Sequence, residues 1–237
     1  MSEPRQMDLS RLSALESLEV ALRLSAARLA VFPTDTVYGI GGSLRSEVGE
    51  AIVAAKGREP DKPLQVIFPN RELLLRSIEF TRAMTDVLHR LLPGPLTIVV
   101  PYPSRFTFPP PATAVWEKKG RLGRRATRKT FATLGVRVPH WPAPVRIMAT
   151  LSVPLVVSSA NRAGEPPPAA LDQVEPALRA RCDLVLDGGP IAGVASTVVD
   201  FSGYDDGYGY RILRRGAVSE EQIDEMLRRK RKDLPAV

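Results

Sequence analysis

The stretch VFPTDTVYGIGG at residues 31–42 places a proline, two threonines and three glycines directly behind an apolar run. Thr34, Thr36 and Tyr38 bring hydroxyl groups to the end of a predicted buried strand at 28–33. Glycine adopts positive φ without strain and lets backbone approach a ligand closely. The simplest interpretation of the three glycines is a tight turn from this strand into the next helix. A dinucleotide-binding turn is a weaker interpretation, because GIGGSL lacks the last glycine of that fingerprint. The open question is what the two threonines hold.

The composition of the chain is that of a globular protein. It has 237 residues, of which 44% are hydrophobic, and this suffices for a core of ordinary size. The longest apolar runs, such as LTIVV at 96–100, are far shorter than the roughly 20 residues of a membrane-spanning helix. The first residues, MSEPRQMDLS, lack the basic and apolar segments of a secretory signal. We therefore expect a soluble, cytoplasmic protein with no membrane partner.

Cysteine and histidine are scarce in this chain. The single cysteine, Cys182, rules out an internal disulfide framework and any multi-cysteine metal site. It lies in RCDLVLDG, a context that predicts a small buried residue and not a nucleophile. The histidines, His89 and His140, are too far apart in sequence to form a metal-ligand motif. The sequence therefore predicts no protein-held metal, and it contains no GxSxG elbow for a serine nucleophile.

The positive charge of the chain is concentrated in two runs. Of the formal net charge of +7, +6 lies in residues 117–129 and +5 in residues 228–232, so that the rest carries about −4. Such runs often contact phosphate-rich partners. A solvated loop and a frayed helix end explain them equally well. The high isoelectric point thus describes two local segments and not a basic globule.

Hydrophobic periodicity predicts an alternation of helices and strands. In the first helix, at 10–29, leucines recur mostly at three- and four-residue steps and predict an amphipathic face: Leu12, Leu15, Leu18, Leu22 and Leu29. Further helices are predicted at 46–58, 70–78, 81–91, 142–152, near 171–180 and at 219–232. Strands are predicted at 28–33, 62–69, 94–101, 133–139, 154–160, 182–189, 196–202 and 210–216. This mixture predicts an α/β or α+β fold, in which helices cover a partly antiparallel sheet in one domain.

Residues 103–130 form the only long segment without clear periodicity. They are rich in proline at the start and in basic residues toward the end. We interpret them as a long loop, and loops of this length are either functional or mobile.

The segment KGREPDKP, residues 56–63, gathers Lys56, Arg58 and Lys62 just behind a predicted helix. Such clusters hold phosphate groups, with arginine supplying a planar fork and lysine a point charge. The segment is not a Walker loop, because the glycine-rich approach and the GK[ST] end are absent. Bases that compensate a helix dipole would explain Lys56 and Arg58 equally well, but Lys62 less well.

One arginine interrupts the apolar strand TLGVRVP. By alternation Arg137 shares a face with Gly135 and points away from Val136 and Val138. It lies either on a solvated face or in a pocket where it meets a carboxylate or a phosphate. The residues leave these two alternatives open.

Hydroxyl and amide groups also gather in VVSSANRAGEPPP. Ser158, Ser159 and Asn161 could cap a helix, but the prolines at 166–168 leave little helix to cap. Contacts with a ligand at the end of a strand explain these three residues better. Ser196 in GVASTVVD follows the same pattern. Together with the cations, these groups offer no obvious nucleophile or general base. The set suits an enzyme that positions charged substrates and neutralises phosphate charge.

Seven motifs in order now identify a resemblance: PTDTVYGIGG, KGREPDKPL, LPGPLTIVV, GVRVP, SSANRAGEPP, ASTVVD and ILRRGAVSEEQI. They closely resemble the YrdC-like threonylcarbamoyl-AMP synthase family over about residues 15–227. The resemblance implies a twisted mixed sheet, flanked by helices, around a deep, positively charged groove. It implies a single YrdC-like domain over 1–237, with a basic insertion at about 104–130 and a basic tail at 228–237.

The resemblance also implies a reaction. L-threonine, bicarbonate and ATP, with Mg²⁺ bound to the nucleotide, would give L-threonylcarbamoyladenylate and pyrophosphate. A separate tRNA-modifying transferase complex would use this product on adenosine 37 of tRNA. The opening loop would then hold the threonine substrate.

The family motifs imply roles for individual residues. Those implied to carry the reaction are Lys56, Arg58, Ser159 and Asn161. Those implied to hold ATP are Lys56, Arg58, Lys62, Thr133, Asn161 and Arg214. Those implied to contact L-threonine are Thr34, Thr36, Arg137, Ser159 and Ser196, with Arg137 opposite the substrate carboxylate.

Two departures from the family pattern affect these expectations. Ile67 stands where many members carry histidine, so that one expected threonine contact is missing. Residues 104–130 look longer and more basic than the usual connection and could be a lid, a tRNA contact or decoration. Two alternative functions stay open: an RNA-binding module that uses 117–129, and a related carbamoyl-transferring adenylation enzyme. Sparse aromatic residues argue against single-strand stacking in the first case.

Overall fold

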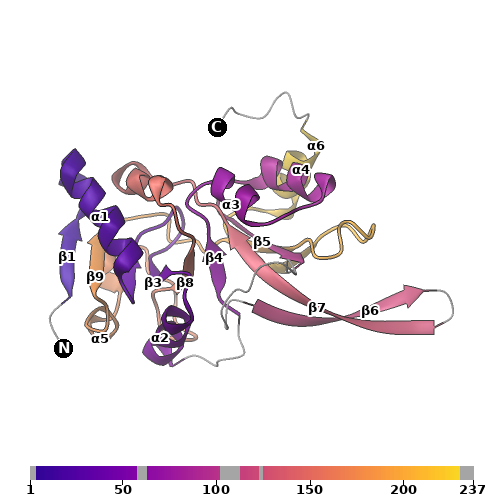
Figure 1. The fold of residues 1–237 in the computed structure, drawn as a ribbon, viewed down its shortest axis with the longest axis horizontal. Coiled ribbons are helices and arrows are strands. Elements are labelled where there is room, and N and C mark those ends of the chain that lie inside the picture. Colours follow the sequence, from indigo (N-terminus) through magenta and orange to yellow (C-terminus); the bar gives the residue numbers. More distant parts are fainter. Residues whose placement is uncertain (1–3, 58–62, 102–112, 123–124, 230–237) are drawn as a thin grey trace.

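The computed structural model describes residues 4–57, 63–101, 113–122 and 125–229. Within these residues, eleven strands form one twisted sheet in the order β1-β9-β2-β3-β8-β4-β7-β5-β10-β11, with β6 paired to β7 outside this order. The strands are β1 (Arg5–Asp8), β2 (Ala30–Phe32), β3 (Gly39–Ser43), β4 (Gln65–Ile67), β5 (Leu96–Pro101), β6 (Thr113–Leu122), β7 (Arg125–Arg137), β8 (Leu155–Ser159), β9 (Leu184–Asp187), β10 (Thr197–Asp200) and β11 (Arg211–Arg214). The sheet contains both parallel pairs, such as β2–β9 and β4–β7, and antiparallel pairs, such as β2–β3 and β4–β8, which confirms the predicted mixed sheet with flanking helices (Figure 1).

The helices are α1 (Ala14–Ala26), α2 (Ser46–Lys56), α3 (Arg71–Ser77), α4 (Arg82–Leu91), α5 (Pro176–Arg179) and α6 (Glu220–Arg228). The described residues also contain three short 3-10 helices, η1 (Leu9–Arg11), η2 (Ala143–Thr150) and η3 (Leu171–Gln173). The predicted helix at 142–152 is thus a 3-10 segment, in which Val145 leaves helical backbone geometry. Side-chain caps agree with the sequence pattern elsewhere, since Ser13 and Ser219 each begin their helix with a reciprocal capping box.

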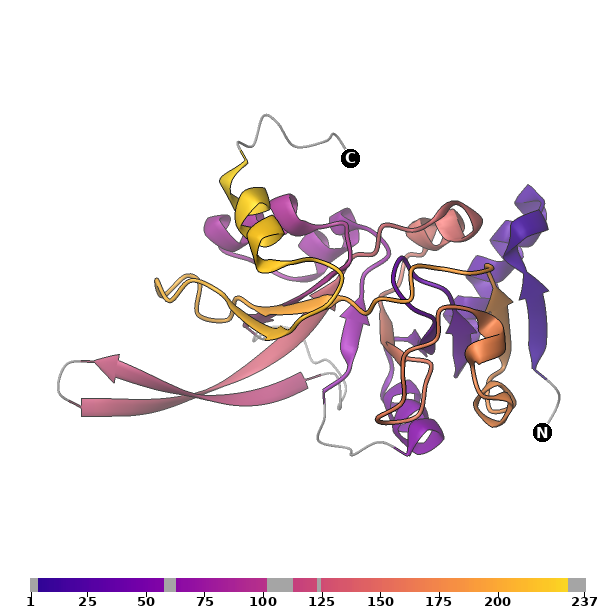
Figure 2. The same ribbon diagram turned by 180° about the vertical axis from the view of Figure 1, so that it is seen from behind.

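Two hydrophobic cores lie on opposite faces of the sheet. Alternate residues of β2 show the division: Val31 joins the larger core, while Ala30 and Phe32 join the smaller one, as strand alternation requires. The larger core packs side chains of α2, α3, α4 and α6, and the smaller one packs α1 and η2. The sheet is therefore covered on both faces near its centre (Figures 1 and 2).

The glycines of the opening motif form a strand and not the predicted turn. Gly39, Gly41 and Gly42 belong to β3, which pairs antiparallel with both β2 and β8. A Cβ at Gly41 would lie 2.1 Å from the carbonyl oxygen of Val156, and one at Gly39 would lie 2.9 Å from a methyl of Val157. Gly39 and Gly41 are needed because β8 lies too close to β3 for side chains at these two positions. The interpretation as a strand-to-helix turn was wrong, and the chain turns into α2 only after Ser43.

The leucine stripe of α1 faces outward, contrary to the amphipathic pattern. Leu15, Leu18 and Leu22 are 78%, 53% and 64% exposed, while Val20 and Leu24 are fully buried. Helix α1 packs against β3 and η2, where smaller residues such as Ala21 and Ala27 permit close approach. The helix also ends at Ala26, so Leu29 lies beyond it. Hydrophobic periodicity thus predicted the helix correctly but predicted the wrong face of it to be buried.

The predicted long loop contains a β-hairpin. Residues 113–122 and 125–137 form β6 and β7, which pair antiparallel along ten residue pairs from Thr113↔Leu134 to Leu122↔Arg125. The two strands project from the body of the sheet (Figures 1 and 2). The loop prediction was wrong here because neither strand alternates polar and apolar residues, as a half-buried strand would. Residues 102–112 and 123–124 lie outside the described residues.

Candidate functional site

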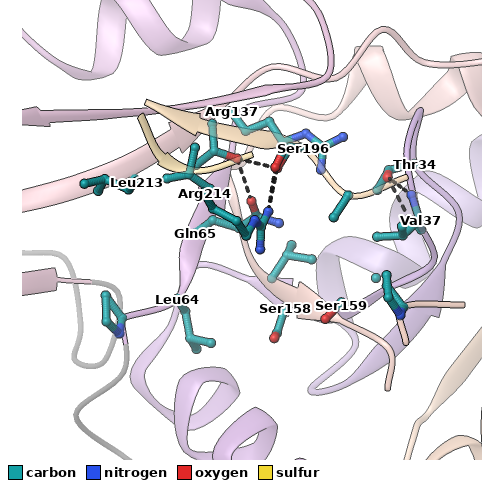
Figure 3. A pocket seen from close by; sticks show the side chains of 18 of the residues that line it. Thr34, Val37, Leu64, Gln65, Arg137, Ser158, Ser159, Ser196, Leu213 and Arg214 are labelled. Atoms are coloured by element: carbon teal, nitrogen blue, oxygen red, sulfur yellow. Dashed lines mark hydrogen bonds between the residues drawn. The ribbon is translucent and has the colours of Figure 1, made fainter. Parts of the chain in front are cut away.

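A cavity of about 450 Å³ opens on one face of the sheet. Its walls come from β4, β5, β7, β8, β10 and β11 and from the loop that follows β2 (Figure 3). Seven residues predicted to contact substrates line it: Thr34, Thr133, Arg137, Ser159, Asn161, Ser196 and Arg214. These residues lie up to 180 positions apart in sequence, and the fold brings them to one place.

Four further predicted residues are not among those that line this cavity in the described part of the chain. Thr36 is fully buried behind the cavity wall, where its hydroxyl contacts both Thr34 and Arg137. Lys56 lies behind Ser158 and Ser159, as described below. Arg58 and Lys62 lie outside the described residues, so their predicted phosphate contacts stay predictions.

The loop after β2 is held by the hydroxyl of Thr34. This hydroxyl donates to the carbonyl of Val37 at 2.8 Å and accepts from the backbone N–H groups of Thr36 and Val37 at 3.2 and 3.3 Å. Such local bonds from threonine stabilise a tight turn. Tyr38 closes the loop from the other end, since its hydroxyl donates to the carbonyl of Gly189 at 2.8 Å. The threonine hydroxyls thus shape the loop as well as line the cavity.

Arg137 is the most buried cation in the described part of the chain, with an exposed fraction of 1%. It pairs with Asp35 and donates to the hydroxyl of Thr36 at 2.7 Å. Burial lowers the pKa of Arg137, and the charge of Asp35 opposes that shift. Its Nε is buried and has no hydrogen-bond partner, so one donor of the guanidinium is unsatisfied. The alternative of a solvated face is excluded, and Gly135 lines the cavity beside it as alternation predicted.

Lys56, the last residue of α2, points into the end of β8. Its ammonium donates to the hydroxyl of Ser158 at 2.9 Å and to the carbonyl of Ser159, and it lies 3.4 Å from the hydroxyl of Ser159. Only 7% of Lys56 is exposed. The positive charge therefore sits directly behind the serines that line the cavity, where it orients their hydroxyl groups.

Asn161 offers an acceptor to the site. Its amide nitrogen donates to the carbonyls of Arg162 at 3.0 Å and Glu165 at 2.6 Å. These two bonds fix the orientation of the amide, so that Oδ1 is the atom left over. Oδ1 is buried and has no partner, which makes a ligand N–H or O–H its natural complement.

A hydrogen-bond chain that the sequence did not predict crosses the floor of the cavity. Arg214 donates to the hydroxyl of Ser196 at 3.1 Å, Ser196 lies 2.8 Å from the hydroxyl of Thr97, and Thr97 donates to Oε1 of Gln65 at 3.0 Å. Figure 3 shows Gln65, Ser196 and Arg214 converging on one wall. Because Oε1 of Gln65 is used, its amide nitrogen is left to donate. Gln65 and Thr97 are each the single polar residue in an apolar strand, and this signal could have found them.

The electrostatics of the cavity favour an anion. Burial lowers the pKa of Arg214, and the positive charge of Arg137 lowers it further. Two cations that repel each other across one cavity are stabilised by a negative group between them. The hydroxyl-bearing residues Thr34, Thr133 and Ser159 also line the cavity.

Ile67 does not line this cavity. It is fully buried in the smaller core, in the same apolar cluster as Phe32, Trp141 and Val157. The position at which the resemblance led us to expect histidine is therefore filled by apolar packing in this chain.

Other kinds of site are not seen in the described residues. Among them, no group of three or more histidine, cysteine, aspartate or glutamate side chains could hold a metal ion. No described helix has the length and apolarity that crossing a membrane requires. Cys182 is buried, as predicted.

The sequence matches the model of the Sua5/YciO/YrdC family, described as "Telomere recombination", over residues 23–216. The chain belongs to this family. The threonylcarbamoyl-AMP synthase of Bacillus subtilis is 30% identical over 213 residues, which are 88% of this chain and 56% of that protein. A Mycobacterium tuberculosis protein that bears the same name provisionally is 30% identical over 95% of this chain and 93% of its own length. The chain thus spans little more than half of some members of the family and nearly all of others.

Solved structures of the family have the same fold. The Pyrococcus abyssi Sua5 protein in complex with L-threonine superposes with a TM-score of 0.73 at 27% identity, covering 95% of this chain and 61% of that one. The Escherichia coli YciO structure gives a TM-score of 0.71 at 16% identity and covers 94% of this chain and all of that one. The second likeness shows the YrdC-like fold alone.

Proposed function

We propose that this protein is an L-threonylcarbamoyladenylate synthase, which forms its product and pyrophosphate from L-threonine, bicarbonate and ATP. The observation that carries this proposal is that residues of all seven motifs line one cavity of about 450 Å³. The cavity combines two arginines, several hydroxyls and an unpartnered amide oxygen. These groups suit two anionic substrates held side by side. Membership of the family and relatives that carry this name support the same conclusion.

The threonine end of the cavity is proposed to lie at the loop after β2. Thr34 lines it, and Arg137 is the proposed partner of the substrate carboxylate. Since one nitrogen of Arg137 already pairs with Asp35 and Thr36, its remaining donors would serve the ligand. That a related Sua5 protein has been crystallised with L-threonine supports threonine as the amino acid.

The nucleotide end is proposed to lie toward β8, β10 and β11. Lys56, together with Arg58 and Lys62, would neutralise the phosphates. Arg214 and Thr133 would add a cation and a hydroxyl. Asn161 and Ser159 would lie at the junction of the two substrates. Mg²⁺ would arrive with the nucleotide, because it prefers phosphate oxygens to dedicated protein cages.

The chemistry asked of the protein is mostly placement. The neutral amine of threonine adds to bicarbonate, with loss of water, to give a carbamate. A carbamate oxygen then attacks the α-phosphorus of ATP, and the bond to pyrophosphate breaks. Cations around the phosphates stabilise the charge that develops on the leaving group. Partial seclusion in the cavity would protect the carbamate from water, and a separate transferase complex would pass the product to tRNA.

The test is an assay of pyrophosphate release. We expect release from ATP to require both L-threonine and bicarbonate, and the adenylate to be detected by mass spectrometry. Equal release in the absence of threonine would reject the proposal. Lys56→Ala should abolish turnover, and its melting curve should show that the protein is still folded.

A further inference from the structure

Away from the cavity, helix α1 presents an apolar face to the outside of the molecule. Five large hydrophobic side chains are exposed in the described residues, and three of them belong to this helix: Leu15, Leu18 and Leu22. They are three and four residues apart, so they lie along one side of α1. Val20 and Leu24, which pack into the smaller core, lie on the opposite side. We call Leu15, Leu18 and Leu22 the leucine stripe.

The spacing of the leucine stripe is typical of a surface that pairs with another helix. A step of three residues followed by a step of four is the pattern of paired helices, in which apolar side chains of one helix fill the spaces between those of the other. A single exposed leucine is common on a protein surface, whereas a contiguous apolar patch marks an interaction site. The stripe is therefore suited to a helical partner.

The stripe is complementary to a second copy of itself when the two helices run antiparallel. Turning α1 end to end brings Leu15 of one copy level with Leu22 of the other, and it brings Leu18 next to Leu18. A two-fold axis near Leu18 thus matches the same patch on both copies, as a symmetric dimer interface requires. The antiparallel direction also opposes the two helix dipoles.

The charged residues beside the stripe favour the same arrangement. Glu19 pairs with Arg5 at 2.9 Å and with Arg23 at 2.6 Å, and Glu16 lies on the same side of the helix as Arg23. Two acids and two bases balance, so two copies of this surface do not repel each other. Glu16 belongs to the first turn of α1 and Arg23 to the last. Reversing the second helix therefore brings the acidic end of each copy toward the basic end of the other, whereas parallel helices would oppose like charges.

We propose that the leucine stripe is the interface of a homodimer, in which α1 of one copy packs antiparallel against α1 of the other. A membrane surface matches the stripe less well, because helices that lie on membranes are rich in lysine and arginine on their polar side. The stripe residues are not among those that line the cavity. The proposal therefore stands apart from the proposed function, and each can fail without the other.

The first experiment is sedimentation velocity of the full chain without substrates. Because association depends on concentration, the protein is measured from about 1 to 100 μM. We expect the natural protein to shift from monomer to dimer over this range, and the variant Leu18→Glu/Leu22→Glu to stay monomeric. The matched control, Val194→Gln/Tyr208→Gln, replaces the other two exposed large hydrophobic residues of the described chain and should dimerise as the natural protein does. Circular dichroism verifies that both variants are folded.

A second experiment tests the direction of the helices by disulfide cross-linking. Leu18→Cys should form a disulfide between two copies under mild oxidation. Leu15→Cys should not, because antiparallel helices separate its two copies by seven residues, or about 10 Å along the axis, beyond the roughly 7 Å between Cα atoms that a disulfide spans. The native Cys182 is buried and serves as the internal control in the natural protein.

Several results would overturn the proposal. A monomer at every concentration, or a dimer that Leu18→Glu/Leu22→Glu leaves intact, would show that the stripe is not the interface. Equal cross-linking of Leu15→Cys and Leu18→Cys would exclude the antiparallel arrangement. Binding of a monomer to vesicles of phosphatidylcholine and phosphatidylserine, lost in Leu18→Glu/Leu22→Glu, would assign the stripe to a membrane surface instead.

Discussion

Arg137 and Asp35 form a buried ion pair between β7 and the loop after β2. The side chains are 1% and 9% exposed, respectively, and the residues lie 102 positions apart in sequence. The second oxygen of Asp35 accepts from the backbone N–H of His140 at 2.9 Å. The pair therefore fastens the loop to the strand and sets the guanidinium against the cavity before any substrate arrives. Asp35 positions Arg137, although sequence reasoning assigned it no role.

Removing Asp35 should destabilise the protein strongly. In Asp35→Ala the guanidinium of Arg137 stays buried without its counter-charge, which costs about 3–5 kcal/mol in comparable buried pairs. Urea unfolding measures this loss. The double variant Asp35→Ala/Arg137→Met, which buries no charge, should recover most of it. A single variant as stable as the natural protein would show that the pair is unimportant for the fold.

The sequence predicted best those residues whose chemistry conflicts with their surroundings. Arg137 in an apolar strand, and Ser159 and Asn161 ahead of three prolines, were singled out for that reason, and all three line the cavity. Strand alternation also placed Gly135 correctly. Such residues are visible locally because burial of a polar group is unfavourable without a partner.

Features that depend on distant segments were not predictable in this way. The outward leucines of α1 follow from what the helix packs against, and this is not encoded within the helix. The strand formed by the glycines of β3 follows from the close approach of β8, which lies more than a hundred residues later. Gln65 and Thr97 each look like an isolated polar residue until the fold joins them. Packing partners decided each of these cases.

Gly41→Ala should disrupt the centre of the sheet. The added methyl would lie 2.1 Å from the carbonyl oxygen of Val156, and the backbone of a central strand has little freedom to move. We expect a loss of about 3 kcal/mol or more, at the upper end of overpacking effects. Gly135→Ala is the matched control, since its methyl would meet Thr97 only at 3.5 Å. Equal melting temperatures of the two variants would contradict the close approach of β3 and β8.

The thiol of Cys182 should contribute to stability only below strongly alkaline pH. Burial, assisted by the charge of Asp183, raises the pKa of Cys182 from 9.0 to about 12. The unfolded chain therefore loses this proton first, and the contribution is complete below pH 9 and disappears as the pH rises to about 12. Three pKa units correspond to about 4 kcal/mol. Unfolding of Cys182→Ala across this range should lack that decline, whereas an identical decline would show that the thiol is not the cause.

Gln65 should influence nucleotide binding through its amide nitrogen. Thr97 occupies Oε1, so the nitrogen is the atom available to an anionic ligand in the cavity. Gln65→Glu keeps the acceptor for Thr97 but replaces the donor with a negative charge near Arg214. Loss of a hydrogen bond to a charged group costs about 1.5–3 kcal/mol, and we therefore expect KM for ATP to rise at least about tenfold. If no turnover is found, the shift in melting temperature on addition of ATP measures the same effect.

Gln65→Met separates the two causes in this experiment. Methionine has a similar length and offers neither donor nor negative charge, so its KM for ATP should rise less than that of Gln65→Glu. The KM for L-threonine should change little in both variants, because Gln65 and Thr34 lie on different sides of the cavity (Figure 3). A rise in both KM values together would mean that Gln65 supports the shape of the cavity as a whole. Unchanged values in Gln65→Glu would mean that its amide does not face the nucleotide.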